Sequence, residues 1–218
     1  MEHQIRWIPG DGSTALAVRS IGAGTPGWRN DAPNGLDRFD ADGRSYLLQT
    51  TRGDWAGGWA NLWDITDPAA PAHVWRYPAS GGLDAPHAPL LRRFGGRWWL
   101  LYAHAGLGTL GLAVTDEVTA LPAYVADLAP EDGPFDFLRG VDLDDDGWLW
   151  LTDSGPGDGL SVEPRGRVLR ARMPEGLQPT GASGSFLEPL ARETLPDVVL
   201  LADGLVNPFE GWLWVPGG

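Results

Sequence analysis

The sequence predicts an all-β protein, a β-propeller formed as one domain over residues 1–218. Three observations predict this fold. Short runs of apolar residues alternate with turns rich in glycine and aspartate, which is typical of strands joined by tight loops. Helical periodicity is almost absent. A strand–turn–strand pattern also recurs along the chain, and repeats of about 50 residues with several short strands each are what propeller blades need.

The recurrence is anchored on four turn glycines that lie 53, 51 and 64 residues apart, namely Gly43, Gly96, Gly147 and Gly211. A short dipeptide opens each unit, and the four dipeptides are Gly35-Leu36, Ala88-Pro89, Gly140-Val141 and Gly204-Leu205. The fourth unit stops soon after its turn, while residues 1–34 offer two strands without a turn partner. Because exposed strand edges favour aggregation, we expect four blades, the last closed by strands from both termini. An incomplete five-bladed propeller is the alternative.

The elements follow in chain order. Two short β-like runs, 5–8 and 15–18, flank a P-G-D-G turn. Asp42-Gly43 is a strong hairpin signal, and a buried strand is expected directly after it at 46–48. Further strands are expected at 59–65, 73–77, 98–102, 110–114, 148–152, 166–173 and 211–215.

Composition limits the partners. Sixteen basic and 29 acidic residues give a net charge of −13, which would repel a nucleic acid or an anionic membrane surface. We therefore expect a small neutral ligand, such as a sugar. Cysteine is absent, which removes disulfides and thiolate chemistry. No segment resembles a signal peptide or a membrane span, so a cytoplasmic location is the default expectation, although a mature secreted chain would have the same sequence.

One segment carries a family resemblance. WRNDAPNG, residues 28–35, resembles the W-x-N-D-P-N-G signature of glycoside hydrolase family 32, the fructosidases and invertases, whose five-bladed propeller is shared in broad form with family 43. The resemblance implies that Asp31 is a nucleophile, although Ala32 is inserted beside it. ETLPD, residues 193–197, resembles the E-C-P-D box of the family and implies that Glu193 is the acid/base. Arg139 matches the Arg of the R-D-P box, where Gly140 replaces the Asp.

The resemblance implies a carbohydrate-active protein that hydrolyses a glycosidic bond with retention, using one ionised and one protonated carboxyl group. Indole rings in glycine-rich loops are good platforms for sugars. Asp142, like Asp136, could replace the missing carboxylate of the R-D-P box. The residues expected to contact the sugar are Trp28, Asn30, Asn34, Gln49, Trp55, Trp59, His87, Arg139 and Asp142.

Two alternatives stand beside the hydrolase. The first is a non-catalytic ligand-binding or interaction propeller. The second is a metal-dependent lactonase, because segments of the chain also resemble the senescence-marker/gluconolactonase and NHL-type propellers, which implies Asn34 and Asp203 as metal ligands. Asp142, Asp144 and Asp146 have the spacing of a calcium loop, but this loop continues directly into a strand. We therefore expect a metal-free turn and no cofactor.

Overall fold

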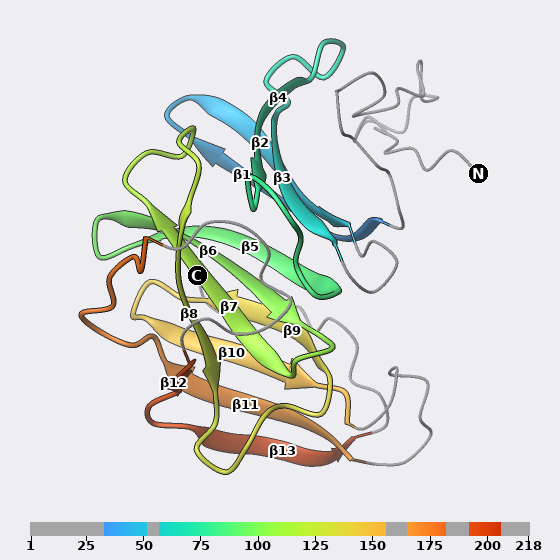
Figure 1. The fold of residues 1–218 in the computed structure, drawn as a ribbon, viewed down its shortest axis with the longest axis vertical. Helices are drawn as coiled ribbons and strands as arrows, with labels where there is room; N and C mark the ends of the chain where they lie inside the picture. The colour runs from blue at the N-terminus through green and yellow to red at the C-terminus, as the bar shows by residue number, and fades with distance from the viewer. Residues whose placement is uncertain (1–32, 52–56, 156–164, 182–191, 206–218) are drawn as a thin grey trace, which may run out of the picture.

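The computed structural model describes residues 33–51, 57–155, 165–181 and 192–205 (Figure 1). These residues form thirteen strands and no helix. The all-β prediction is therefore confirmed for the described part of the chain. None of its elements is a helix long and apolar enough to cross a membrane.

The strands form three sheets, which follow one another along the chain except for one strand, β12, that returns to the second sheet (Figure 1). The first sheet contains, in antiparallel order, β1 (Pro33–Ala41), β2 (Arg44–Thr51), β3 (Trp59–Asp64) and β4 (Ala72–Tyr77). The second contains β5 (Pro86–Phe94), β6 (Arg97–His104), β7 (Thr109–Thr115) and β8 (Ala123–Ala129), with β12 (Arg192–Thr194) parallel to β8. The third contains β9 (Leu138–Leu143), β10 (Trp148–Asp153), β11 (Gly166–Arg172) and β13 (Val199–Leu205).

The sheets pack face to face around their first strands. β5 packs against β1 and β2, and β9 packs against β5 and β6. Leu100 belongs to the core between the first and second sheets, whereas the next residue, Leu101, belongs to the core between the second and third. Since successive side chains of a strand point to opposite faces, β6 is buried on both faces. This explains why its sequence is a continuous apolar run rather than an alternating one.

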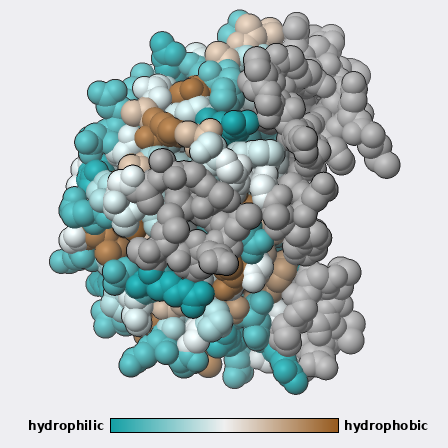
Figure 2. All heavy atoms as spheres, in the orientation of Figure 1, coloured by the Kyte–Doolittle hydropathy of each residue, from teal (hydrophilic) through white to brown (hydrophobic). Residues whose placement is uncertain are grey.

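The hairpin turns follow the sequence signals. Asp42 and Gly43 both have positive φ angles, 51° and 74°, as do Gly95 and Gly96, at 58° and 83°. Two central residues with positive φ are the requirement of the type I′ turn that fits twisted antiparallel strands. The surface in the view of Figure 2 is mostly polar, with apolar residues in small scattered patches.

The predicted D-x-D-x-D-G segment forms the turn between β9 and β10. Asp144 Oδ1 accepts hydrogen bonds from the backbone N–H groups of Asp146, at 3.1 Å, and Trp148, at 2.8 Å. Its Oδ2 accepts one from the indole N–H of Trp150, at 3.0 Å. The Asp144 carboxylate therefore has a structural role in closing the turn, and the absence of a metal there stays a prediction.

Replacing Asp144 with alanine is expected to lower the free energy of unfolding by about 1–2 kcal/mol, because three hydrogen bonds to a carboxylate are lost at a partly exposed turn. Equilibrium urea denaturation measures this change, and Asp145→Ala, at an exposed position of the same turn, is the matched control. A rise in melting temperature with calcium that disappears in Asp144→Ala would contradict the metal-free turn.

The structure differs from the predicted repeat at its end. Gly204 and Leu205, which we aligned with the openings of the first three units, end β13 instead. β13 is the edge strand of the third sheet and pairs with β11. The alignment relied on the spacing between Gly204-Leu205 and Gly211, and such local spacing does not distinguish the first strand of a sheet from the strand at its opposite edge. The strands expected at 5–8, 15–18 and 211–215 lie outside the described residues.

Candidate functional site

Three residues predicted to contact a ligand occupy the same position in the three sheets. Asn34, His87 and Arg139 are each the second residue of the first strand of a sheet, in β1, β5 and β9. These three strands pack against one another in that order. The fold therefore brings an amide, an imidazole and a guanidinium group together at the N-terminal ends of the first strands of the three sheets.

Each first strand is irregular at this position. Asn34 is skipped in the pairing of β1 with β2, and Arg139 is skipped in the pairing of β9 with β10. In β5 the register with β6 shifts directly after His87. Such bulges turn a side chain out of the regular alternation and are over-represented beside functional sites. Because a register irregularity occurs at the equivalent position of all three first strands, we take this end of the sheets as the candidate site.

The three side chains are connected. Asn34 Nδ2 lies 2.8 Å from His87 Nε2 and donates a hydrogen bond to the carbonyl of Pro86 at 3.4 Å. Because an amide N–H can only donate, Nε2 is the acceptor and the imidazole proton is on Nδ1. The ring of Phe137 lies edge-on to His87, with centroids 5.5 Å apart, and the guanidinium carbon of Arg139 lies 4.6 Å from the centroid of Phe137. We call Asn34, His87, Phe137 and Arg139 the entry site.

The backbone around His87 is strained. Ala85 and Ala88 have φ angles of 38° and 42°, in the left-handed region that residues with a Cβ rarely adopt. Such conformations cost free energy, and they cluster at binding and catalytic sites where the surrounding structure holds them. Here they flank the two residues, Pro86 and His87, that contact Asn34.

A carboxylate on the third sheet fixes Phe137 in the entry site. Asp153 is fully buried and accepts hydrogen bonds from the backbone N–H of Phe137, at 2.8 Å, and of Asp136, at 3.2 Å. Arg167 donates to the same carboxylate from Nη2 at 2.6 Å. The segment that carries Phe137 and Arg139 is therefore tied to the end of β10.

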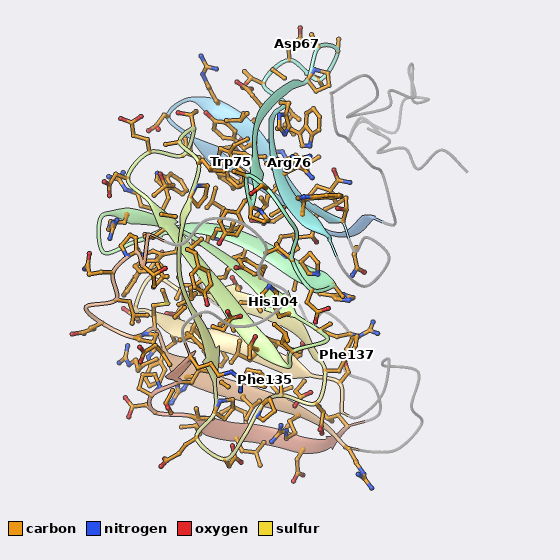
Figure 3. All side chains as sticks on the ribbon, viewed as in Figure 1. Asp67, Trp75, Arg76, His104, Phe135 and Phe137 are labelled. Atoms are coloured by element: carbon orange, nitrogen blue, oxygen red, sulfur yellow. The ribbon has the colours of Figure 1, made fainter. Side chains whose placement is uncertain are left out.

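Sequence reasoning missed Asp84, which precedes β5. Its half-buried carboxyl group packs against the backbone of Gly106, where a Cβ would overlap it. It has no hydrogen-bond or ion-pair partner among the described residues. Burial raises its pKa above the usual value, while the charge of His104 opposes that rise. Figure 3 shows Phe137 near the edge of the described sheets, with His104 closer to the middle of the view.

A signal for Asp84 was present in the sequence. The segment D-A-P-N at 31–34 is repeated as D-A-P-H at 84–87, and the third sheet has D-F-L-R at 136–139. Each unit thus carries an aspartate three residues before its entry-site side chain. The resemblance to the glycosidase signature pointed to the aspartates of the first and third copies, Asp31 and Asp136, but not to Asp84.

Other predicted ligand contacts lie elsewhere in the first sheet. Tyr46 and Leu48 face the second sheet, so the alternation of β2 turns Gln49 to the opposite face. Gln49 is fully buried and is paired across the sheet with Asn61. Trp59 is on this same face, where it contacts Arg76 through its ring. Gln49 and Trp59 are therefore not brought to the entry site.

The remaining predicted residues are scattered. Asp142 is exposed on β9 and accepts a hydrogen bond from the N–H of Leu143. Glu193 is exposed in β12, which is four strands away from β5 in the second sheet and so about 19 Å from it. Asp203 is exposed in β13, at the edge of the third sheet opposite β9. The structure does not bring Glu193 or Asp203 to Asn34. Trp28, Asn30, Asp31 and Trp55 lie outside the described residues.

The segment that resembles the E-C-P-D box borders a pocket of its own, here called the outer pocket. This pocket has a volume of about 500 Å³ and lies between the 130–132 turn, β12 and the start of β13. Thr194 and Asp197 line it, together with Glu131, Asp132 and Arg167. Arg167 is already paired with the buried Asp153, so the remaining charges of this pocket are acidic.

Among the described residues, no group of three or more His, Asp or Glu side chains has an arrangement that could hold a metal ion. Comparisons with protein-family models, with curated proteins and with solved structures find no match to this chain. The resemblances to glycoside hydrolases and to lactonase propellers therefore stay predictions.

Proposed function

We propose that this protein is a β-propeller that binds a small, neutral, hydroxyl-rich ligand of the carbohydrate class at the entry site. One observation carries the proposal, namely the equivalent placement of Asn34, His87 and Arg139 at three bulged strand ends, with Asn34 and His87 in direct contact. Amide, imidazole and guanidinium groups offer several hydrogen-bond donors and acceptors that suit vicinal hydroxyl groups. The net charge of −13 disfavours a polyanionic ligand.

The propeller part of the proposal is supported by the two outermost sheet faces. Gln49 and Asn61 are 0% and 1% exposed on the face of the first sheet that points away from the second sheet. Both amide atoms of Gln49 and Oδ1 of Asn61 have no hydrogen-bond partner among the described residues. Buried amides need partners, so this face is suited to contact with a further polar chain segment.

The far face of the third sheet has a related character. The guanidinium of Arg170 lies 4.0 Å, and that of Arg172 3.7 Å, from the ring of Trp148. A stacked layer of Trp and Arg is amphipathic and packs well against another sheet. We therefore infer that the three sheets are three blades and that a fourth blade, which includes the terminal residues, lies between these two faces.

Replacing His87 with alanine is expected to weaken the binding of a sugar at least about tenfold, because a hydrogen-bonded side chain is removed from the site. Isothermal titration calorimetry with fructose, arabinose and sucrose measures the change. Asn34→Ala, at a half-buried position, should have a similar effect if His87→Ala proves unstable. Glu193→Gln, on the distant strand β12, is the matched control and should bind like the wild type. Loss of binding in Glu193→Gln but not in Asn34→Ala would contradict the proposed site.

A further inference from the structure

We infer that the free edge of β13, together with the outer pocket, is a docking site for an extended, basic peptide segment of a partner protein. The segment adds to the third sheet as a further strand. The second sheet has such an addition within the chain itself, since β12 pairs in parallel with its outer strand β8. The docking site is separate from the entry site, because β9, which carries Arg139, is three strands and so about 14 Å away from β13.

The edge strand β13 is exposed and apolar. Among the described residues, it pairs with β11 on one side and with no strand on the other (Figure 1). Three of the five exposed large apolar side chains of these residues follow one another in β13, namely Val199, Leu200 and Leu201, with exposed fractions of 40%, 52% and 45%. β13 has no proline and no basic residue, which commonly keep a strand edge from pairing. Its apolar side chains and backbone groups are therefore open to another strand.

The outer pocket lies beside this edge. Leu200 is paired with Leu169 of β11, and both side chains line the pocket, which places the pocket on their face of the third sheet. Val199 is paired with Arg170 and belongs to the opposite face. A strand added to β13 therefore directs alternate side chains to the outer pocket and the others to the side of Val199. The pocket volume of about 500 Å³ is ample for such side chains.

The charge of the outer pocket determines which strand fits. Glu131, Asp132 and Asp197 line the pocket, and all three are exposed. Arg167, the one basic group among the described lining residues, donates a hydrogen bond to the buried carboxylate of Asp153 at 2.6 Å. A lysine or arginine of the added strand is therefore attracted to the pocket, whereas an acidic side chain is repelled. The aliphatic part of a lysine also packs along the apolar edge.

A second copy of this chain fits the edge poorly. Antiparallel pairing of two β13 strands with Leu200 opposite Leu200 sets Asp203 of each copy opposite Asp197 of the other, and parallel pairing in register sets Asp203 opposite Asp203. Like charges directly opposite each other destabilise a strand pair. The net charge of −13 opposes self-association further. The proposed fourth blade leaves this edge open as well, because propeller blades pack through their faces.

The test is a titration of the ¹⁵N-labelled full chain with a synthetic peptide of alternating lysine and valine that has seven residues, the length of β13. Amide shifts should change at 199–203 and at 131–132, and the amides of β13 should exchange hydrogen more slowly, because backbone groups of the edge gain partners. The same peptide with glutamate in place of lysine should not bind. A lysine–valine peptide with a central proline should bind at least about tenfold more weakly, because proline lacks the N–H that pairs with the edge.

A matched pair of double variants tests the charge of the pocket. Asp132→Asn with Asp197→Asn is expected to weaken binding of the lysine–valine peptide at least about threefold at low salt. Asp42→Asn with Asp145→Asn, at exposed positions of two distant turns, removes the same charge and should bind like the wild type. Asp197 and Asp42 both have positive φ angles, 53° and 51°, which asparagine tolerates, so neither exchange strains the backbone.

A second pair of variants tests the apolar edge. Leu200→Thr is expected to weaken binding of the lysine–valine peptide at least about threefold, whereas Leu36→Thr, at a position 55% exposed on β1, should have no effect. Absence of binding, equal binding of the glutamate or proline peptide, or equal effects of a variant and its control overturn the inference. Changes in β13 that depend on protein concentration without peptide would reveal a second copy at this edge and overturn it too. Sugar binding should be unchanged in all these variants, so the proposed function is tested separately.

Discussion

Replacing Asp127 with alanine is expected to lower the free energy of unfolding by about 3–5 kcal/mol, the range typical for removing one partner of a buried charged network. The Asp127 carboxylate is fully buried in β8. It accepts hydrogen bonds from the hydroxyl groups of Tyr124, at 2.6 Å, and Thr109, at 2.9 Å, and its Oδ1 lies 2.9 Å from His104 Nδ1. The alanine variant would leave these three polar groups buried without their acceptor.

Equilibrium denaturation of the wild type and the variant measures this loss. Asp116→Ala is the matched control, because Asp116 is 81% exposed and its ion pair with Arg97 is worth at most about 1 kcal/mol. A loss for Asp127→Ala no larger than that of the control would contradict the arrangement of the second sheet described above.

The same carboxylate gives a pH dependence whose direction follows from its pKa. Burial opposes ionisation, but His104, Tyr124 and Thr109 together hold the pKa of Asp127 below its usual value. A carboxyl group with a lower pKa in the folded state stabilises the fold at pH values above its unfolded pKa, about 3.9. This contribution is lost as the pH falls below about 4 toward the folded pKa. The stability difference between wild type and Asp127→Ala should therefore shrink in acid.

Deleting residues 1–20 is expected to abolish soluble expression, because the proposed fourth blade would no longer cover the outer face of the first sheet. That face presents Leu47, Trp63 and Ile65 beside Gln49. Exposure of such a face and of unpaired strand edges leads to aggregation. Expression and size-exclusion chromatography of the truncated and full chains measure the effect.

A thiol probe tests the same burial without a deletion, since the chain has no cysteine. Gln49→Cys in the full chain should react slowly with a maleimide, whereas Asp40→Cys, at a position whose side chain is 64% exposed, should react quickly. A soluble, monomeric truncated protein in which the cysteine at position 49 is still protected would rule out closure by the N-terminal residues.

Local signals predicted much of the fold. The Asp42-Gly43 and Gly95-Gly96 turns were predictable because type I′ turns need residues that tolerate positive φ. β2, β6 and β10 were recognised from their apolar runs. β8 was not expected, although it pairs with the neighbouring β7. β12 and the edge position of β13 were not predicted because pairing between distant segments depends on the packing of whole sheets. No local pattern indicated that the chain between β11 and β13 adds a strand to the second sheet.

Part of the candidate site was also predictable from local sequence. Asn34, His87 and Arg139 stand at equivalent points of the repeat, so a correct repeat brings them together. Gln49 was expected to contact the ligand, but the alternation of β2 turns its side chain to the face of the first sheet that points away from the second sheet. Asp84 was missed although its surroundings repeat D-A-P, because its burial and lack of partners are visible only in three dimensions.

Chemical-shift mapping of a bound sugar tests the location of the site most directly. Amide spectra of the ¹⁵N-labelled protein, titrated with whichever of fructose, arabinose and sucrose binds in calorimetry, report which residues the ligand contacts. We expect the largest changes at Asn34, at 84–88 and at 137–139, with little change in β12. Changes concentrated instead at Glu131, Thr194 and Asp197, around the outer pocket, would contradict the entry site as the place where this protein acts.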